Sequence, residues 1–216
     1  MTKTLSGPML AARTPQPRHL MVLLHGYGSD GADLLPIAQY WSNALPDVLF
    51  VAPNAPDVCA INPGGYEWFP LRTDRVLSRV EGAEQGRDVI VNFLVDLWAQ
   101  TGLTPADTIL LGFSQGAMMA LHAGLSLDAP LAGIVAFSGA LIPPPGLLEG
   151  LPAKPPVAIA HGDLDGVVDP ALSREAVETL TGLGYAVSYH RSPRTAHGIS
   201  EDMLDFALDF IRARTN

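Results

Sequence analysis

Residues 108–127 read TILLGFSQGAMMALHAGLSL, and this stretch decides the fold. Its first six residues form a continuous apolar run of strand length, which is typical of a strand buried on both faces of a sheet. Residues 115–127 are small or apolar on nearly every side, which predicts a helix in the interior. Ser114 stands at the junction, between Gly112 and Gly116. A strand, a tight turn and a buried helix in succession indicate an α/β protein.

Apolar runs and amphipathic stretches alternate on both sides of this segment. The further predicted strands cover residues 19–25, 48–52, 131–137, 157–160 and 185–191. The further predicted helices cover about 34–41, 80–100, a segment that begins at Pro170 with Asp169 as its cap, and about 199–211. Short connections between such elements predict a mostly parallel sheet with helices on both faces, in one domain spanning 1–216. Residues 5–12 are predicted to add an antiparallel edge strand.

Two segments are rich in proline and glycine and read as irregular loops, 53–77 and 138–155. Loops of this length in a compact domain are usually functional. Neither is long enough to form a cap domain, so the sequence predicts an open, shallow site.

The composition excludes several classes of function. The chain has 216 residues with a formal net charge of −9 and no run rich in Lys or Arg, which argues against nucleic acids and anionic membranes as partners. One cysteine, Cys59, excludes an intramolecular disulfide and any site built from several thiolates. Prolines and arginines interrupt the first 20 residues, and no uninterrupted apolar stretch can span a bilayer. We therefore expect a cytoplasmic protein without stable membrane insertion.

Ser114 is the predicted nucleophile. A nucleophile elbow needs a serine in a strained strand-to-helix turn, with small neighbours that let the surrounding chain come close, and GFSQG between a strand and a helix meets both needs. The alternative is that Ser114 only caps the following helix.

A serine hydroxyl needs a base, and six histidines are available. His25 and His161 each end an apolar strand before a glycine and are interpreted as structural. His197 lies in a loop between the last predicted strand and the last helix. Because loops that leave the carboxyl ends of parallel strands gather at one edge of the sheet, His197 is predicted to face Ser114. Activity should fall at acidic pH, since the imidazole acts as a base only while neutral.

The imidazole in turn needs an acceptor, and the loop HGDLDG at 161–166 offers Asp163 and Asp165. Asp165 is favoured because it lies farther out along the turn. The chain order Ser114, Asp165, His197 is the one found in α/β-hydrolases.

Two backbone N–H groups are candidates for stabilising the oxyanion. Gln115 supplies one, at the start of a helix whose dipole also favours an anion. Tyr27 is the candidate for the other, in the HGYG segment after the first predicted strand of the parallel sheet. An ordinary glycine turn is the alternative for this second segment.

Several motifs together resemble the phospholipase/carboxylesterase family of small α/β-hydrolases, whose eukaryotic members are acyl-protein thioesterases. They are LLHGYGSDGADL at 23–34, VAPNAP at 51–56, Trp68-Phe69, GFSQGA at 112–117, HGDLDGVV at 161–168 and AHGIS at 196–200. The resemblance implies an α/β-hydrolase fold with Ser114 as nucleophile, Asp165 as acid, His197 as base, and the Tyr27 and Gln115 amides as oxyanion hole. One departure is Val168-Asp169-Pro170, where the family often has Val-Pro.

The expected substrate is a small-molecule ester or thioester with a short to medium acyl chain. The predicted apolar walls of its site are Tyr27, Tyr66, Trp68, Phe69, Leu141 and Ile142, each of which could instead be packing beneath a loop. An acyl-protein thioesterase or lysophospholipase, a lyase or perhydrolase, and a non-catalytic ligand-binding hydrolase fold are the alternatives.

No cofactor or metal is expected. The histidines lack metal-ligand spacing, and Gly26-Tyr27-Gly28 lacks the third glycine of a dinucleotide fingerprint. Cys59 has no base beside it in the sequence and is interpreted as a spectator. The chain is expected to be a monomer or a homodimer.

Overall fold

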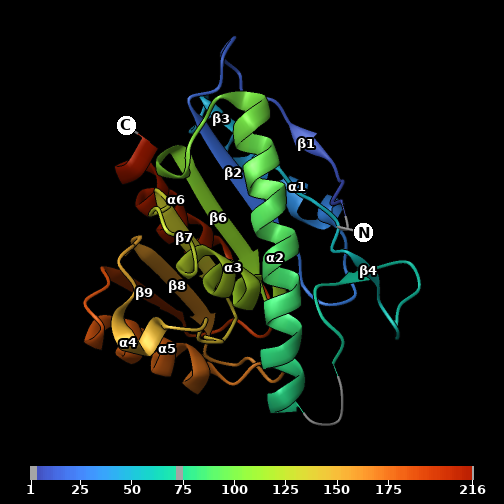
Figure 1. Cartoon of the computed structure of the whole chain (residues 1–216), viewed down its shortest axis with the longest axis vertical. Helices are drawn as coiled ribbons and strands as arrows, with labels where there is room; N and C mark the ends of the chain where they lie inside the picture. The colour runs from blue at the N-terminus through green and yellow to red at the C-terminus, as the bar shows by residue number, and fades with distance from the viewer. Residues whose placement is uncertain (1–3, 72–74, 216) are drawn as a thin grey trace.

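The computed structural model describes residues 4–71 and 75–215, and its centre is a seven-stranded sheet in the order β1-β3-β2-β6-β7-β8-β9 (Figure 1). The strands are β1 Met9–Leu10, β2 His19–Leu24, β3 Val48–Val51, β6 Thr108–Phe113, β7 Gly133–Phe137, β8 Val157–Gly162 and β9 Val187–Ser192. Every neighbouring pair is parallel except β1 with β3. This confirms the predicted mostly parallel sheet with an antiparallel strand at its edge.

Helices cover both faces of the sheet. The helices are α1 Leu35–Trp41, α2 Arg75–Thr101, α3 Gln115–Leu125, α4 Leu147–Gly150, α5 Pro170–Gly182 and α6 Glu201–Thr215, with 3-10 turns at Gly31–Leu34 and Pro105–Asp107. Buried side chains of α2, α3 and α5 share one apolar cluster with the sheet, and those of α1 and α6 share a second cluster on the opposite face. Figure 1 shows α2 crossing the near face. The arrangement is that of an α/β-hydrolase, and within the described residues no cap domain interrupts it.

The continuous apolar run of β2 is explained by this layering. Leu20, Val22 and Leu24 point into the cluster beneath α2 and α3, whereas Met21 and Leu23 point into the cluster beneath α1 and α6. All five are fully buried. Both faces of a central parallel strand lie against helices, so both sets of side chains are apolar.

Helix α3 lies in the interior, as its composition predicts, and every residue from Gln115 to Leu125 is buried. Asp169 caps α5 as predicted, with its side chain accepting a hydrogen bond from the Ala171 N–H at 2.8 Å.

The segment 53–77 differs from the prediction of an irregular loop. It contains a small antiparallel pair, β4 Asp57–Val58 with β5 Tyr66–Glu67, and α2 begins at Arg75. Residues 72–74 of this segment lie outside the described residues. Strands of two residues are too short for periodicity to reveal. The loop 138–155 likewise contains α4, a single helical turn.

Candidate active site

Ser114 occupies a strained turn between β6 and α3. Its φ of 54° and ψ of −115° are unusual for a residue with a side chain. A Cβ on Gly116 would lie 2.0 Å from the carbonyl oxygen of Leu24, and a Cβ on Gly112 would lie 2.1 Å from the carbonyl oxygen of Gly116. Only glycine allows α3 to approach β2 and β6 this closely. The turn has the geometry of a nucleophile elbow.

Three side chains far apart in the sequence form one hydrogen-bonded chain. His197 Nε2 lies 3.0 Å from Ser114 Oγ, and His197 Nδ1 lies 2.7 Å from Asp165 Oδ2. Because an ionised carboxylate can only accept, Nδ1 carries the hydrogen, and the Nε2 lone pair faces the serine hydroxyl. The arrangement can take the serine proton and stabilise the imidazolium that results.

Asp165 is buried and saturated with donors. Its Oδ1 accepts hydrogen bonds from the N–H groups of Val167 at 2.8 Å and Val168 at 2.9 Å, while Oδ2 faces His197. Burial by itself would raise the pKa of the Asp165 carboxyl, but the hydrogen bonds from His197, Val168 and Val167 hold that pKa below its ordinary value. The carboxyl is therefore ionised at neutral pH.

Asp163 has a different partner from Asp165. The Arg191 guanidinium donates to both of its oxygens, at 2.9 and 3.0 Å, in an ion pair at the protein surface. The geometry thus supports the choice of Asp165 over Asp163 as the partner of His197.

The Tyr27 and Gln115 amides belong to two segments that meet at Ser114. Within residues 4–71 and 75–215, neither N–H donates to another protein group. The hairpin β4–β5 anchors the Tyr27 segment, because the Gly28 N–H donates to the Tyr66 carbonyl at 2.9 Å and the Tyr66 N–H donates to the Ser29 carbonyl at 2.7 Å. The Tyr27 segment is thus held by hydrogen bonds to the hairpin beside Ser114.

His25 secures the start of the same segment. Its Nε2 accepts the Ala55 N–H at 3.0 Å, so Nδ1 carries the hydrogen and donates to the Gly26 carbonyl at 2.7 Å. Burial lowers the pKa of His25, opposed by the Gly26 hydrogen bond and by Asp30 and Asp33. The ring is neutral and holds the backbone.

The side chain of Gln115 performs a task that its sequence motif does not reveal. Its Oε1 accepts the Trp68 N–H at 2.9 Å, and its Nε2 donates to the Phe69 carbonyl at 2.7 Å. The Trp68 indole N–H donates to the His25 carbonyl at 2.9 Å. The pair Trp68-Phe69 is thereby tied to both the elbow and the Tyr27 segment.

A cavity of about 480 Å³ opens at Ser114 and His197. Its other lining residues are Gly26, Tyr27, Ser29, Asp33, Leu34, Ile37, Phe113, Gly198 and Ile199. Several of these residues lie in or next to the motifs that the sequence singles out. This position in the sequence is the feature that could have indicated that they line the site. The carboxylate of Asp33, which accepts a short hydrogen bond from the Ser29 hydroxyl, is the charged group in this lining.

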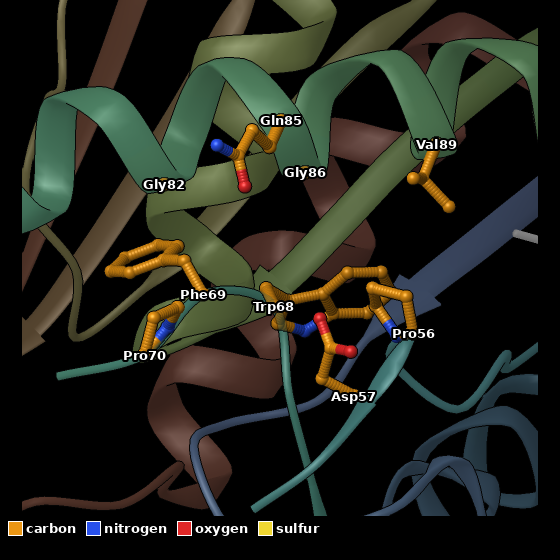
Figure 2. A pocket seen from close by; sticks show the side chains of 9 residues that line it. All are labelled: Pro56, Asp57, Trp68, Phe69, Pro70, Gly82, Gln85, Gly86 and Val89. Atoms are coloured by element: carbon orange, nitrogen blue, oxygen red, sulfur yellow. The ribbon is translucent and has the colours of Figure 1, made fainter. Parts of the chain in front are cut away.

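Of the six predicted wall residues, Tyr27 lines this cavity and the other five do not. Trp68 and Phe69 are 2% and 1% exposed because Gln115 and His25 hold them in the core. Ile142 is also buried, and its carbonyl faces His122 Nδ1 at 2.9 Å. Tyr66 and Leu141 pack against the core cluster. The aromatic pair instead borders a separate cavity of about 140 Å³ beneath α2, with Gly82, Gln85, Gly86 and Val89 on its helical side (Figure 2).

Neither a metal centre nor a membrane span is found in the part of the chain that the structure describes. No group of three or more His, Cys, Asp or Glu side chains there could hold a metal ion. None of its helices combines the length and the apolarity that crossing a bilayer requires.

The sheet, its helices and the turn at Ser114 place the protein in the α/β-hydrolase class. A model of the Phospholipase/Carboxylesterase family matches residues 7–215, and the chain belongs to that family. It is a hydrolase of carboxylic esters.

Relatives with established names agree with this assignment. Acyl-protein thioesterase 1 of Neurospora crassa is 30% identical over 225 residues, which cover 96% of this chain and 91% of the relative. Esterase YpfH of Escherichia coli is 28% identical over 201 residues, which cover 90% of this chain and 82% of the relative. The crystal structure of esterase PE8 is 54% identical with a TM-score of 0.94, covering 98% of this chain and 99% of that one. The predicted family and fold are confirmed.

Proposed function

We propose that the chain hydrolyses short- to medium-chain esters and thioesters through Ser114, His197 and Asp165. The observation that carries the proposal is the pair of contacts made by His197, 3.0 Å to the serine oxygen and 2.7 Å to the carboxylate, at the edge of an open cavity. Removing the hydroxyl or the imidazole would break the path of the proton, and removing the carboxylate would leave the imidazole without the partner that holds its tautomer and stabilises its charged form.

In the proposed mechanism, His197 Nε2 takes the proton of Ser114 as the serine oxygen attacks the carbonyl carbon. The carbonyl oxygen becomes negative and is held by the N–H groups of Tyr27 and Gln115. As the tetrahedral adduct collapses, the imidazolium gives its proton to the leaving alcohol or thiol, and an acyl-enzyme is left. Water then repeats the sequence and releases the carboxylic acid.

The lining of the cavity supports a compact acyl or alcohol group. The apolar surface of the cavity comes from four side chains that belong to, or pack against, the cluster beneath α1 and α6. They are Leu34, Ile37, Phe113 and Ile199. Its volume of about 480 Å³ falls in the range of small-molecule sites. The other five predicted wall residues would support the residues of the site and would not contact the substrate. They are Tyr66, Trp68, Phe69, Leu141 and Ile142.

A protein thioester is the second candidate substrate. The names of the Neurospora crassa relative and of a Saccharomyces cerevisiae relative that is 33% identical over 190 residues, both acyl-protein thioesterase 1, favour it. The same attack on an acyl carbon serves both leaving groups. Rates on p-nitrophenyl esters of graded chain length, on acyl-CoA and on S-acylated peptides would distinguish the two candidates.

Covalent labelling tests the proposed nucleophile. A fluorophosphonate should modify the wild-type chain at Ser114, as located by peptide mass spectrometry, and should leave Ser114→Ala unmodified. Absence of an adduct in a folded wild-type protein would favour a non-catalytic binding module. Product analysis with and without peroxide separates hydrolysis from perhydrolysis.

The domain organisation, the cellular compartment and the oligomeric state of the enzyme are also proposed. We infer a single domain over residues 1–216 from the one continuous main sheet, and a cytoplasmic enzyme from the lone, buried Cys59. We propose that the enzyme is a monomer or a homodimer, because the proposed catalytic residues all come from one chain. Light scattering would give the mass of the particle in solution.

A further inference from the structure

A second histidine contacts the proposed catalytic acid. His161, in β8, is fully buried, and its Nε2 lies 3.1 Å from Oδ2 of Asp165. This is the same oxygen that faces His197 Nδ1 at 2.7 Å. Asp165 therefore sits among four donors, two backbone N–H groups at Oδ1 and two imidazoles at Oδ2.

The surroundings of His161 fix where its hydrogen lies. Nε2 faces acceptors, namely Asp165 Oδ2 and the Val168 carbonyl at 3.0 Å, so Nε2 carries a hydrogen. Nδ1 lies 2.6 Å from the hydroxyl of Ser173, whose single hydrogen can go either to Nδ1 or to the Gly139 carbonyl at 3.1 Å. Burial lowers the pKa of His161, although Val168 and Asp165 oppose that effect. The hydrogen on Nε2 is thus fixed by the two acceptors that it faces.

We propose that His161 is a positioning residue that fixes the carboxylate of Asp165. The negative charge of that carboxylate is then shared between the N–H groups of His161 and His197. The inference rests on the proposed roles of Ser114, Asp165 and His197. Two backbone N–H groups hold Oδ1, and the buried imidazole of His161 holds Oδ2 beside His197, so both carboxylate oxygens are fixed. His197 Nδ1 is aimed by the carboxylate, so the restriction also orients Nε2 toward the serine.

Sharing the oxygen also affects the proton affinity of His197. An acceptor that already receives one hydrogen bond offers less negative charge to stabilise the imidazolium of His197. Loss of the His161 donor should therefore make His197 easier to protonate and move the acidic limb of the kcat/KM profile to higher pH. A residue that only fills space would not move that limb.

The donation from Nε2 of His161 to Asp165 does not depend on the other groups around the ring. On α5 the ring faces the Ser173 hydroxyl through Nδ1, on the side away from Asp165. In the sheet it is paired with Arg191 of β9, whose guanidinium is engaged by Asp163.

Two variants test the role. His161→Leu removes both ring nitrogens at similar volume, whereas His161→Gln can return an N–H donor near the position of Nε2. We expect His161→Leu to lose about 10- to 100-fold in kcat/KM, by analogy with the hydrogen-bond partners of metal-ligating side chains, with its acidic limb shifted upward. His161→Gln should recover most of the rate and the wild-type limb.

The inference fails if folded His161→Leu keeps kcat/KM within twofold and its acidic limb in place. It fails equally if the Gln and Leu variants lose the same amount, because packing alone would then explain the loss. If His161→Leu does not fold, nitrogen-15 NMR of wild-type histidines decides. We expect Nε2 of His161 to carry a hydrogen throughout the titration of His197, and a ring whose Nε2 lacks a hydrogen would overturn the inference.

Ser114→Ala, measured in parallel, separates this inference from the proposed function. If Ser114→Ala is inactive while His161→Leu behaves as wild type, only the role of His161 is refuted. If Ser114→Ala stays active, the proposed function is refuted, and the role of His161 falls with it.

Discussion

Replacing Gln115 by alanine isolates the task of its side chain from that of its backbone. The variant removes the two hydrogen bonds to the Trp68-Phe69 segment while the N–H of residue 115 stays in place at the start of α3. Gln115 is 3% exposed, so water cannot easily replace the missing partners.

The magnitude follows from the two groups left without partners. The Trp68 N–H and the Phe69 carbonyl would each remain buried and unpaired, at a cost of about 1–3 kcal/mol apiece. The free energy of unfolding should therefore fall by about 2–6 kcal/mol. For a chain of this size, such a loss lowers the Tm by about 4–24 °C.

Urea unfolding followed by circular dichroism measures the change, with Gln39→Ala as the control because Gln39 is exposed on α1. The control should unfold within about 0.5 kcal/mol of the wild type. Gln115→Ala should also remain far more active than Ser114→Ala at 25 °C, because its backbone donor is retained. A loss of stability below 1 kcal/mol would refute the reasoning, as would activity as low as that of Ser114→Ala in a folded protein.

Three further outcomes are expected from particular residues. Burial is the largest cause of the lowered pKa of His25, His122 and His161, whose ordinary pKa is 6.5. Below pH 6.5 the unfolded chain therefore binds protons at these side chains that the folded chain does not bind. Stability should hold above pH 6.5 and fall below it, by up to about 1.4 kcal/mol per histidine at pH 5.5 and about 4 kcal/mol for all three, as measured by urea unfolding. Gly116→Ala should lose more than about 3 kcal/mol, or fail to fold, because its methyl would overlap a main-chain carbonyl. Asp33→Asn should raise kcat/KM for anionic esters relative to neutral ones by up to about fivefold at low salt, since the cavity loses a negative charge.

Each expectation has a result that would contradict it. Equal unfolding free energies at pH 7.5 and 5.5 would mean that the buried histidines accept protons in the folded state. Gly182→Ala is the control for Gly116→Ala, because no atom lies within 4 Å of the added methyl, and equal stability of both variants would dismiss the steric argument. A ratio between anionic and neutral esters that Asp33→Asn leaves unchanged would show that this carboxylate does not act on the substrate.

The residues that form the hydrogen-bonded chain could be predicted from the sequence because each follows a strand. The carboxyl ends of β6 and β8 and the loop after β9 meet at one edge of a parallel sheet, so Ser114, Asp165 and His197 are constrained to the same region by topology. The choice between Asp163 and Asp165 is a matter of two residues in one turn. In the structure Arg191 pairs with Asp163, whereas Asp165 lies against His197, and this supports the proposal of Asp165 as the acid.

The lining of the cavity could not be predicted in the same way. Whether Trp68 faces solvent or the core depends on its hydrogen bonds with Gln115 and His25, which lie 47 and 43 residues away along the chain. Local sequence contains no sign of such contacts. The strands β4 and β5 were missed because two residues show no period. The place of His161 before a glycine favours a structural role, yet its partner Asp165 is only four residues ahead, and this short spacing is the sequence feature that indicates their contact.

The most direct test of the central claim is the rate of ester hydrolysis by purified Ser114→Ala. Since the serine oxygen would form the acyl bond itself, we expect kcat/KM on p-nitrophenyl butyrate to fall by about 10⁴-fold or more while the fold is preserved. A folded variant that hydrolyses the ester within tenfold of the wild-type rate would contradict the account, because the bond would then be broken by another group.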